Sequence, residues 1–350
     1  MLILLLLGVG LAWFLADILF RKNWHKKLRV TVEFTDSYVY EGEMSSLKEI
    51  VANDKLLPIP ALEVRLSMSR KLEFAGEARE NSNVTDQSYK RDIFSFLLHQ
   101  QTTRTLPFIC RRRGYYQITK AEAVAYDLFF GAGHYREIPQ QSHMFVYPGQ
   151  VDIRKIRLLC QAVSGMVLVQ NRLYPDPFEF SGIREYRQSD PMNYINWKAS
   201  ARTGGLMVNQ FDSTTNIEVT IILDVEDRNI LKYEALTEES IRIASSLAAA
   251  LVKRKMELTV VSNGRQQEDE DGFRMHLPAG GGRIGALNQK LACIDTGCRV
   301  GEIADLIRQE AGRKKMGHIY LLISKNQDER TAQALRTLAG SCLLYTSRCV

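Results

Sequence analysis

The chain has 350 residues, 45% of them hydrophobic and 25% charged, with a formal net charge of +6. These fractions are near those of ordinary globular proteins, so they exclude a largely disordered chain, and the length allows two domains. The chain has 46 basic and 40 acidic residues. Residues 1–29 hold five of the basic and one of the acidic residues, which leaves 41 basic and 39 acidic residues in the rest of the chain. That balance excludes a broad electrostatic surface for nucleic acid.

Residues 1–20 are almost wholly apolar, with Asp17 as the one charged residue. About twenty such residues in a helix match the thickness of the hydrocarbon core of a membrane. A cleaved signal peptide would carry positive charge before the apolar run and small residues after it, and this chain has neither. The sequence therefore predicts a transmembrane helix at 1–20 and a basic juxtamembrane segment at 21–29. Basic residues favour the cytoplasmic side, so we expect single-pass anchoring in the cell membrane with the body in the cytoplasm.

Residues 30–150 carry hydrophobic side chains at every second position, in short runs separated by turn residues. A period of two with frequent turns is typical of short strands in an antiparallel sandwich. We therefore expect a β-rich, sandwich-like domain over this range. The clearest runs are 28–34, 62–68, 72–74, 105–110, 114–118 and 144–147.

The pattern changes after residue 150. We expect a linker over 151–216, which begins with a helix near 151–169. From 217 to 345, continuous apolar runs predict strands that are buried on both faces, and amphipathic runs predict helices between them. Such alternation predicts an α/β domain with a parallel sheet and helices on both faces. The predicted strands are 219–223, 256–261 and 319–323, and the predicted helices are 233–255, 284–294, 300–313 and 329–338.

The segment 182–202, with the sequence GIREYRQSDPMNYINWKASAR, is the most specific part of the chain. It offers no nucleophile beside a base, no phosphate-binding glycine loop and no set of metal ligands. Its first residues alternate like a strand. Asp190 and Pro191 suit the start of a helix, and Gly204 and Gly205 suit its end. We expect a strand, one helix and a second strand that act in recognition or folding.

This segment resembles the hallmark of the family called domain of unknown function 58. The residues that carry the resemblance are Gly182, Arg184, Glu185, Tyr186, Asp190, Trp197, Ala201 and Arg202. The resemblance implies a β-rich segment followed by a domain similar to von Willebrand factor type A. Members are typically encoded beside a MoxR-type AAA+ ATPase, which implies a partnership with that ATPase in assembling or maturing other proteins.

Two roles are open for the segment 182–202. In the structural role, ion pairs among Arg184, Glu185, Asp190 and Arg202 lock the segment onto the domain. In the docking role, the same residues and Trp197 form a binding site, since Arg and Trp are favoured at interface hot spots. We expect the structural role first, because ion-pair networks are common without function.

The end of the first predicted α/β strand bears on metal binding. Von Willebrand type A domains can bind a divalent ion there through Asp-x-Ser-x-Ser, whereas this chain has Asp224, Glu226 and Arg228 at those positions. Because both hydroxyl ligands are replaced and a hard ion needs several oxygens, we expect no metal and no cofactor. Open α/β sheets place their sites at the carboxyl ends of strands, so Asp224, Glu226 and Asp227 are candidate partner-binding residues.

Two classes of function follow, and no residue is predicted to be catalytic. The favoured one is a non-enzymatic, membrane-anchored interaction or assembly factor that works with a MoxR-type ATPase. The alternative is a ligand- or metal-dependent enzyme or sensor that uses the face around Asp224.

Overall fold

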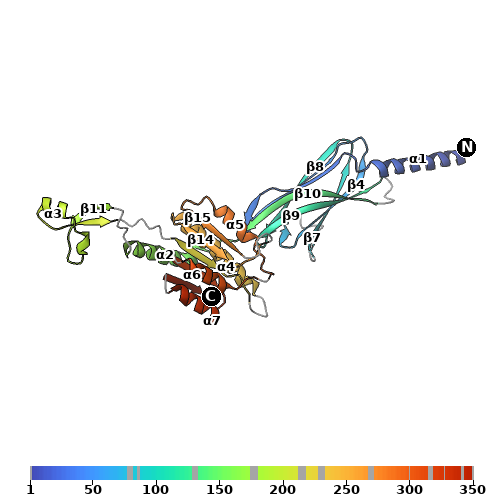
Figure 1. Cartoon of the computed structure of the whole chain (residues 1–350). Coiled ribbons are helices and arrows are strands. Elements are labelled where there is room, and N and C mark those ends of the chain that lie inside the picture. The colour runs from blue at the N-terminus through green and yellow to red at the C-terminus, as the bar shows by residue number, and fades with distance from the viewer. Residues whose placement is uncertain are drawn as a thin grey trace. The chain divides into compact units, whose positions relative to one another are not determined.

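The computed structural model forms two compact units, one of Met1–Gly149 with Leu291–Cys293 and one of Gln150–Lys290 with Ile294–Val350 (Figure 1). We call them the sandwich unit and the α/β unit. The structure describes residues 2–76, 82–84, 87–127, 133–173, 180–211, 218–227, 233–266, 272–298, 300–313, 318–326, 328–339 and 343–348.

The first helix, α1 (Leu2–Asn23), ends against the sandwich. Phe20 and Trp24 are buried in the sandwich core, and the centroids of their rings lie 5.8 and 6.3 Å from that of His134. The Lys55 ammonium donates hydrogen bonds to the carbonyl oxygens of Trp24 and Lys26, and burial lowers the pKa of Lys55 to about 8. The end of α1 is thus part of a folded core.

The prediction of a transmembrane helix at 1–20 was wrong. Among the described residues, no helix has both the length and the apolar character needed to cross a bilayer. The sequence-based count included Phe20, whose ring packs inside the sandwich.

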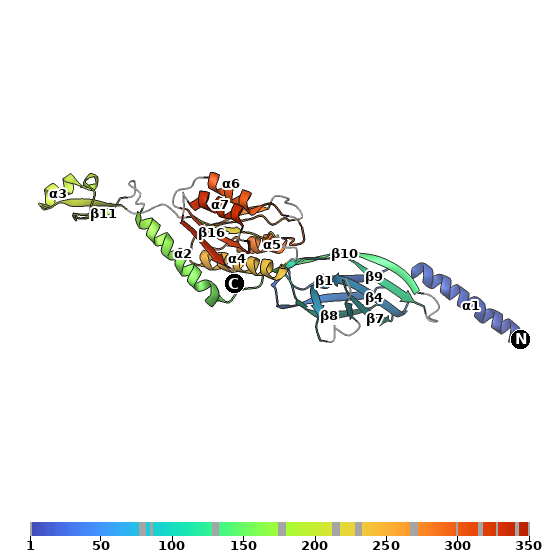
Figure 2. The same cartoon turned by 90° about the horizontal axis from the view of Figure 1, so that it is seen from below.

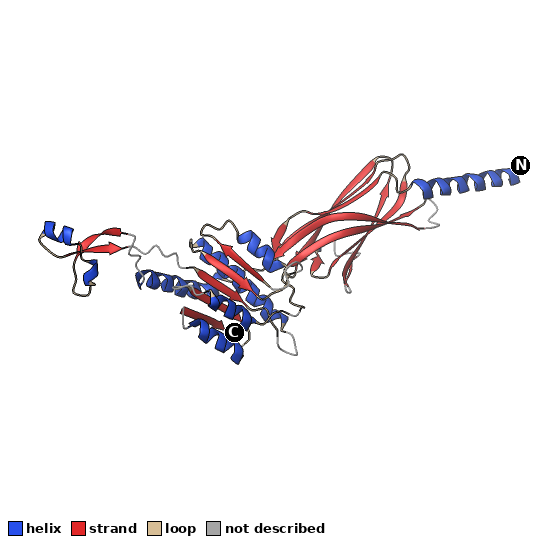
Figure 3. Ribbon diagram, in the orientation of Figure 1, coloured by secondary structure: helices blue, strands red, loops and turns tan. Residues whose placement is uncertain are grey.

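The sandwich unit contains two sheets, drawn as red arrows in Figure 3. Within the described residues every pair of neighbouring strands is antiparallel except β2 and β10, which run parallel, so the expectation of a purely antiparallel sandwich is corrected. The four-stranded sheet has the order β1 (Leu28–Phe34), β3 (Met44–Asn53), β8 (Gln100–Cys110), β5 (Leu72–Phe74). The six-stranded sheet has the order β2 (Tyr38–Tyr40), β10 (Gly133–Tyr147), β9 (Gly114–Tyr126), β4 (Ile59–Ser69), β7 (Gln87–Phe96), β6 (Ser82–Val84).

A side chain closes the outer edge of β1. The register of β10 shifts between Pro139 and Ser142, and this irregularity holds Gln140. The Gln140 amide donates to the Val30 carbonyl at 2.8 Å and accepts from the Val32 N–H at 3.0 Å, as a neighbouring strand would. Strand edges with unpaired backbone groups invite association with other chains, so Gln140 protects this edge.

The α/β unit holds a five-stranded sheet in the order β15, β14, β13, β16, β17. Four strands are parallel: β13 (Val219–Leu223), β14 (Leu258–Ser262), β16 (Ile319–Ser324) and β17 (Leu343–Arg348). The edge strand β15 (Phe273–Leu277) is antiparallel to β14. The predicted parallel sheet is therefore a mixed sheet, and the sequence analysis missed β15.

Helices cover both faces of this sheet, with α4 (Glu234–Lys253) and α2 (Ile153–Leu173) on one side and α6 (Ile303–Gly312) and α7 (Glu329–Ala339) on the other (Figure 2). The predicted apolar face of α4 is fully buried, and α6 and α7 pack on Ile222, Val261 and Tyr320 of the sheet. A further helix, α5 (Ile284–Ala292), follows β15 in the chain.

A cluster of charged side chains lies inside the sandwich. Glu49, Lys90 and Asp92 are each less than 5% exposed, and Arg104 donates to Asp92 at 3.0 Å. Neither carboxylate oxygen of Glu49 has a hydrogen-bond partner among the described residues. Burial, and after it the charge of Asp92, raise the pKa of Glu49 to about 8. The Glu49 carboxyl group therefore carries its proton at neutral pH.

This buried acid predicts a pH-dependent stability. The folded chain keeps a proton on Glu49 that the unfolded chain releases, so the free energy of unfolding falls as pH rises from about 4.5 to about 8. Glu49→Gln removes this titration and should be more stable than the wild type at pH 8 by about 1–3 kcal/mol, with the difference shrinking towards pH 4.5.

Denaturant unfolding at several pH values across this window measures the effect. Glu33→Gln, the same change at an exposed position on β1, is the control and should leave the pH dependence unchanged. A constant difference between Glu49→Gln and the wild type from pH 5 to pH 8 would contradict the assignment.

Candidate functional site

The carboxyl ends of three parallel strands carry the polar side chains of this site. Asp224 follows β13, Asn263 follows β14, and Ser324 ends β16. Strand β13 pairs with β14 on one side and with β16 on the other, so the three chain segments meet at one edge of the sheet. The sequence analysis expected a site at this edge, and the structure places Asp224 at its centre.

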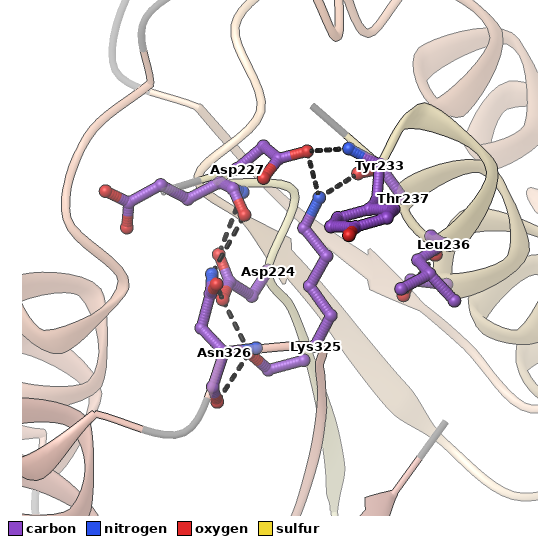
Figure 4. A network of polar contacts seen from close by, with 10 residues as sticks. Asp224, Asp227, Tyr233, Leu236, Thr237, Lys325 and Asn326 are labelled. Atoms are coloured by element: carbon purple, nitrogen blue, oxygen red, sulfur yellow. Dashed lines mark hydrogen bonds and ion pairs between the residues drawn. The ribbon is translucent and has the colours of Figure 1, made fainter. Parts of the chain in front are cut away.

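The Asp224 carboxylate is fully buried and accepts four hydrogen bonds. One oxygen accepts from the Glu226 N–H and the Asn263 amide, both at 3.0 Å. The other accepts from the Ser324 hydroxyl at 2.6 Å and the Asn326 amide at 2.9 Å. Since a carboxylate offers about four lone-pair positions, these neutral donors engage its full accepting capacity. Figure 4 shows Asp224 and Asn326 within this network.

Two asparagine side chains extend the network to neighbouring loops. Asn263 accepts from the Val225 N–H and donates to the Gly301 carbonyl, both at 3.0 Å. Asn326 donates to the Glu226 carbonyl at 2.8 Å (Figure 4). The sequence analysis missed both amides, because a single Asn after a strand is typical of ordinary turns.

Beside this network lies a buried ion pair. The Lys325 ammonium is 2.8 Å from a carboxylate oxygen of Asp227 and 2.6 Å from the Thr237 hydroxyl, and the same Asp227 oxygen accepts from the Tyr233 N–H at 2.7 Å (Figure 4). The side chains of Lys325 and Asp227 are 4% and 9% exposed. Asp227 therefore ties the start of α4 to the end of β16, while Glu226 is partly exposed.

This edge is a poor host for a cation. The amides and the hydroxyl direct their hydrogens at the Asp224 oxygens that a metal would need, so a bound ion would have to displace them. Over the described part of the chain, no three His, Cys, Asp or Glu side chains are placed to hold a metal ion. Arg228, which the sequence analysis placed at a ligand position, lies outside the described residues.

The segment 182–202 lies in a second candidate region, residues 180–211, which we call the hairpin module. It consists of strand β11 (Phe180–Glu185), the short 3-10 helix η2 (Met192–Tyr194), helix α3 (Trp197–Thr203) and strand β12 (Met207–Phe211). The two strands that the sequence predicts here are present, and β11 and β12 form an antiparallel pair.

One ion pair organises the turn after β11. Arg184 donates two hydrogen bonds to the two oxygens of Asp190, at 2.6 and 2.7 Å, and Asp190 also accepts from the Arg187 N–H at 2.8 Å. These bonds lower the pKa of Asp190 to about 2, with the Arg184 bond as the largest cause. The predicted network is smaller than expected, because among the described residues no ion pair joins Glu185 or Arg202 to it.

The prediction of one helix from residue 191 was wrong. Asn196 interrupts it, since its side chain accepts from the Ala199 N–H at 3.0 Å and so caps a new helix, α3. Asp190 caps no helix, because its carboxylate binds Arg184 and Arg187 instead. The predicted end is confirmed.

Gly204 takes the left-handed conformation, with φ 73°, and its N–H donates to the Ser200 carbonyl. The other predicted residues of the module are not members of this ion pair. Gly182 sits beside a register shift in β11, and the Tyr186 N–H donates to the Leu206 carbonyl at 2.9 Å. Trp197 is 67% exposed, and Ala201 and Arg202 are also exposed.

A two-sheet sandwich unit and an α/β unit, with the hairpin module preceding β13, define the architecture of this protein. Residues 182–294 match the family described as "Protein of unknown function DUF58", which confirms the family predicted from the hallmark. The match covers most of the hairpin module and the first part of the α/β sheet.

No curated protein matches the chain. Solved structures similar to part of it include a non-cellulosomal cohesin from Archaeoglobus fulgidus, 11% identical, which covers 34% of this chain and 91% of that chain with a TM-score of 0.24. A type II cohesin domain from Acetivibrio cellulolyticus is 7% identical and covers 34% of this chain and 95% of that chain, also with a TM-score of 0.24. At such TM-scores these similarities support no inference about this protein.

Saturation of the Asp224 carboxylate predicts that Mg2+ leaves stability unchanged. An ion at a hundredfold excess over its dissociation constant would add about 2.7 kcal/mol to the free energy of unfolding. Thermal melts in millimolar Mg2+ and in EDTA should therefore coincide. Asn326→Asp is the matched variant: it replaces a donor to Asp224 with a carboxylate, so it should melt lower in EDTA and recover partly with Mg2+. A shift of several degrees in the wild type, abolished by Asp224→Ala, would restore a native metal site.

The buried ion pair predicts a large effect of a single substitution. Lys325→Met removes the ammonium that pairs with the buried Asp227 carboxylate, which should cost about 3–5 kcal/mol of unfolding free energy. Arg308→Met breaks the exposed pair with Asp305 and should cost less than about 1 kcal/mol. Denaturant unfolding of both variants measures the two losses of unfolding free energy. Equal losses would show that the Lys325 pair does not behave as a buried ion pair.

Proposed function

We propose that this protein is a non-enzymatic interaction or assembly factor that acts with a MoxR-type AAA+ ATPase in the maturation of other proteins. We also propose that its α/β unit is similar to von Willebrand factor type A. The hallmark residues and the match to the family support the proposal. The parallel strands β13, β14 and β16, with helices on both faces, are consistent with that type of domain.

The observation that carries the proposal is the engagement of Asp224. A general base or a metal ligand needs a lone pair that a substrate or ion can reach, and both Asp224 oxygens are instead occupied by donors from three loops. Such cross-linking holds the loops in one arrangement. A fixed surface favours recognition of a protein partner, since little ordering is needed on binding.

Glu226 is the residue of this edge best suited to meet the partner. Its side chain is partly exposed, and it enters the Asp224 network through backbone atoms. Asp227 is less suitable for a test, because its replacement would leave Lys325 buried without its carboxylate.

The test is capture of the neighbouring MoxR-type ATPase by the purified chain, with and without ATP. Glu226→Lys should weaken capture while the melting curve stays near that of the wild type. Glu257→Lys is the matched control, because Glu257 is also partly exposed but precedes β14, at the opposite edge of the sheet. Unchanged capture by Glu226→Lys would remove this edge as the contact, and no capture by the wild type would refute the partnership.

A further inference from the structure

The hairpin module is held by hydrogen bonds rather than by a hydrophobic core. Its buried apolar side chains, among those described, are Ile195 and Val208, which face each other across an isolated bridge. Polar contacts supply the rest: the Asn196 amide donates to the side chain of Asn209 at 2.7 Å, and the Met207 N–H donates to the Ser200 hydroxyl at 2.8 Å. The backbone is therefore well defined without help from the larger apolar side chains.

Those larger apolar side chains are exposed instead. Trp197 is 67% and Met192 70% exposed, and three more apolar residues are at least 43% exposed: Phe180, Ile183 and Leu206. Isolated exposed apolar residues are ordinary, but several on one small module mark an interaction surface. Trp and Met are among the residues enriched at such surfaces.

Helix α3 presents a defined part of this surface. Trp197 and Ala201 are four residues apart, as are Lys198 and Arg202, so the four side chains cover one arc of the helix. All four are exposed. Ser200 lies on the other side, where its hydroxyl bonds to Met207 of β12. We call these four residues the α3 face.

The charge of the α3 face is positive and unneutralised. Over the described residues, Lys198 and Arg202 take part in no ion pair, and Arg184 is the one cation of the module paired with an acid. Residues 180–211 contain four basic and two acidic residues, and one of the acids, Asp190, already belongs to that pair. The complementary surface is therefore acidic.

We propose that the α3 face is a docking site for an acidic segment of a partner protein. Carboxylates of the segment pair with Lys198 and Arg202, and an apolar side chain of the segment covers the Trp197 ring. A nucleic acid fits less well, because its binding usually depends on many phosphate contacts and this face offers two cations. The inference stands apart from the partnership with the ATPase, which concerns the loops around Asp224.

The probe is a labelled synthetic peptide of alternating glutamate and leucine, titrated with the full chain and followed by fluorescence anisotropy. A lysine–leucine peptide and a single-stranded oligonucleotide of equal length are the comparisons. The glutamate peptide should bind best, and added salt should weaken it. Trp197→Ala should weaken binding at least about tenfold, and Lys198→Glu with Arg202→Glu should do the same.

The effect of Trp197→Ala on binding can be measured separately from its effect on folding, because the Trp197 ring is largely exposed. A side chain that is 67% exposed is not part of a core, so its removal should cost little stability. The melting temperature of Trp197→Ala should thus stay near that of the wild type. Lys253→Glu with Lys255→Glu, at exposed positions at the end of α4, is the matched charge control and should bind like the wild type.

Three results would overturn the proposal. The first is no binding of the glutamate peptide, and the second is equal binding by the α3-face variants and the wild type. The third is tighter binding of the oligonucleotide than of the peptide, which would assign the face to nucleic acid.

Discussion

The α/β unit depends on one buried carboxylate. Asp224 sits at the end of the central strand β13, and its four hydrogen bonds reach the loop after β14 and the end of β16. A buried carboxyl group is tolerable only when its oxygens are paired or fully hydrogen-bonded, and here four neutral groups donate hydrogen bonds to them. Removing Asp224 would leave several donors unsatisfied at once. The positions of the loops at this edge, and so the surface they form, follow from this single group.

Glu49 shows what happens when the same chemical group is buried without donors. Its oxygens find no hydrogen-bond partner among the described residues, and burial with the nearby Asp92 raises its pKa to about 8. The two carboxyl groups differ in their surroundings rather than in their burial. Asp224, at the end of β13, accepts hydrogen bonds from four donors, whereas Glu49, inside the sandwich, keeps a proton. The charged cluster in its core therefore makes the sandwich unit sensitive to pH.

The sequence predicted what depends on local periodicity and missed what depends on tertiary contacts. Strand β13 was predicted to the residue, and the buried face of α4 was also predicted, because each is a long apolar pattern. The prediction of a membrane-spanning helix rested on the composition of residues 1–20, and nothing in that composition showed that Phe20 is buried in the sandwich core. Strand β15 was missed because it is an edge strand of only five residues, two of which, Arg274 and His276, are polar. At the site, Asp224 was recognisable because it follows an apolar strand, but no sequence pattern showed that Asn263 and Asn326 would donate hydrogen bonds to its carboxylate.

In the hairpin module, the residues that stabilise the fold are different from the residues that are exposed. Arg184 and Asp190 turn towards each other and fix the loop after β11, and Asn196 and Ser200 fasten α3 to β12. Trp197 and Arg202 take no part in these contacts, although they belong to the same segment. A side chain as large as Trp gains most by burial, so its exposure on a rigid scaffold has a free-energy cost that binding would offset. Of the two roles first posed for this segment, the structural one falls on Arg184 and Asp190, and the docking role proposed for the α3 face falls on different residues.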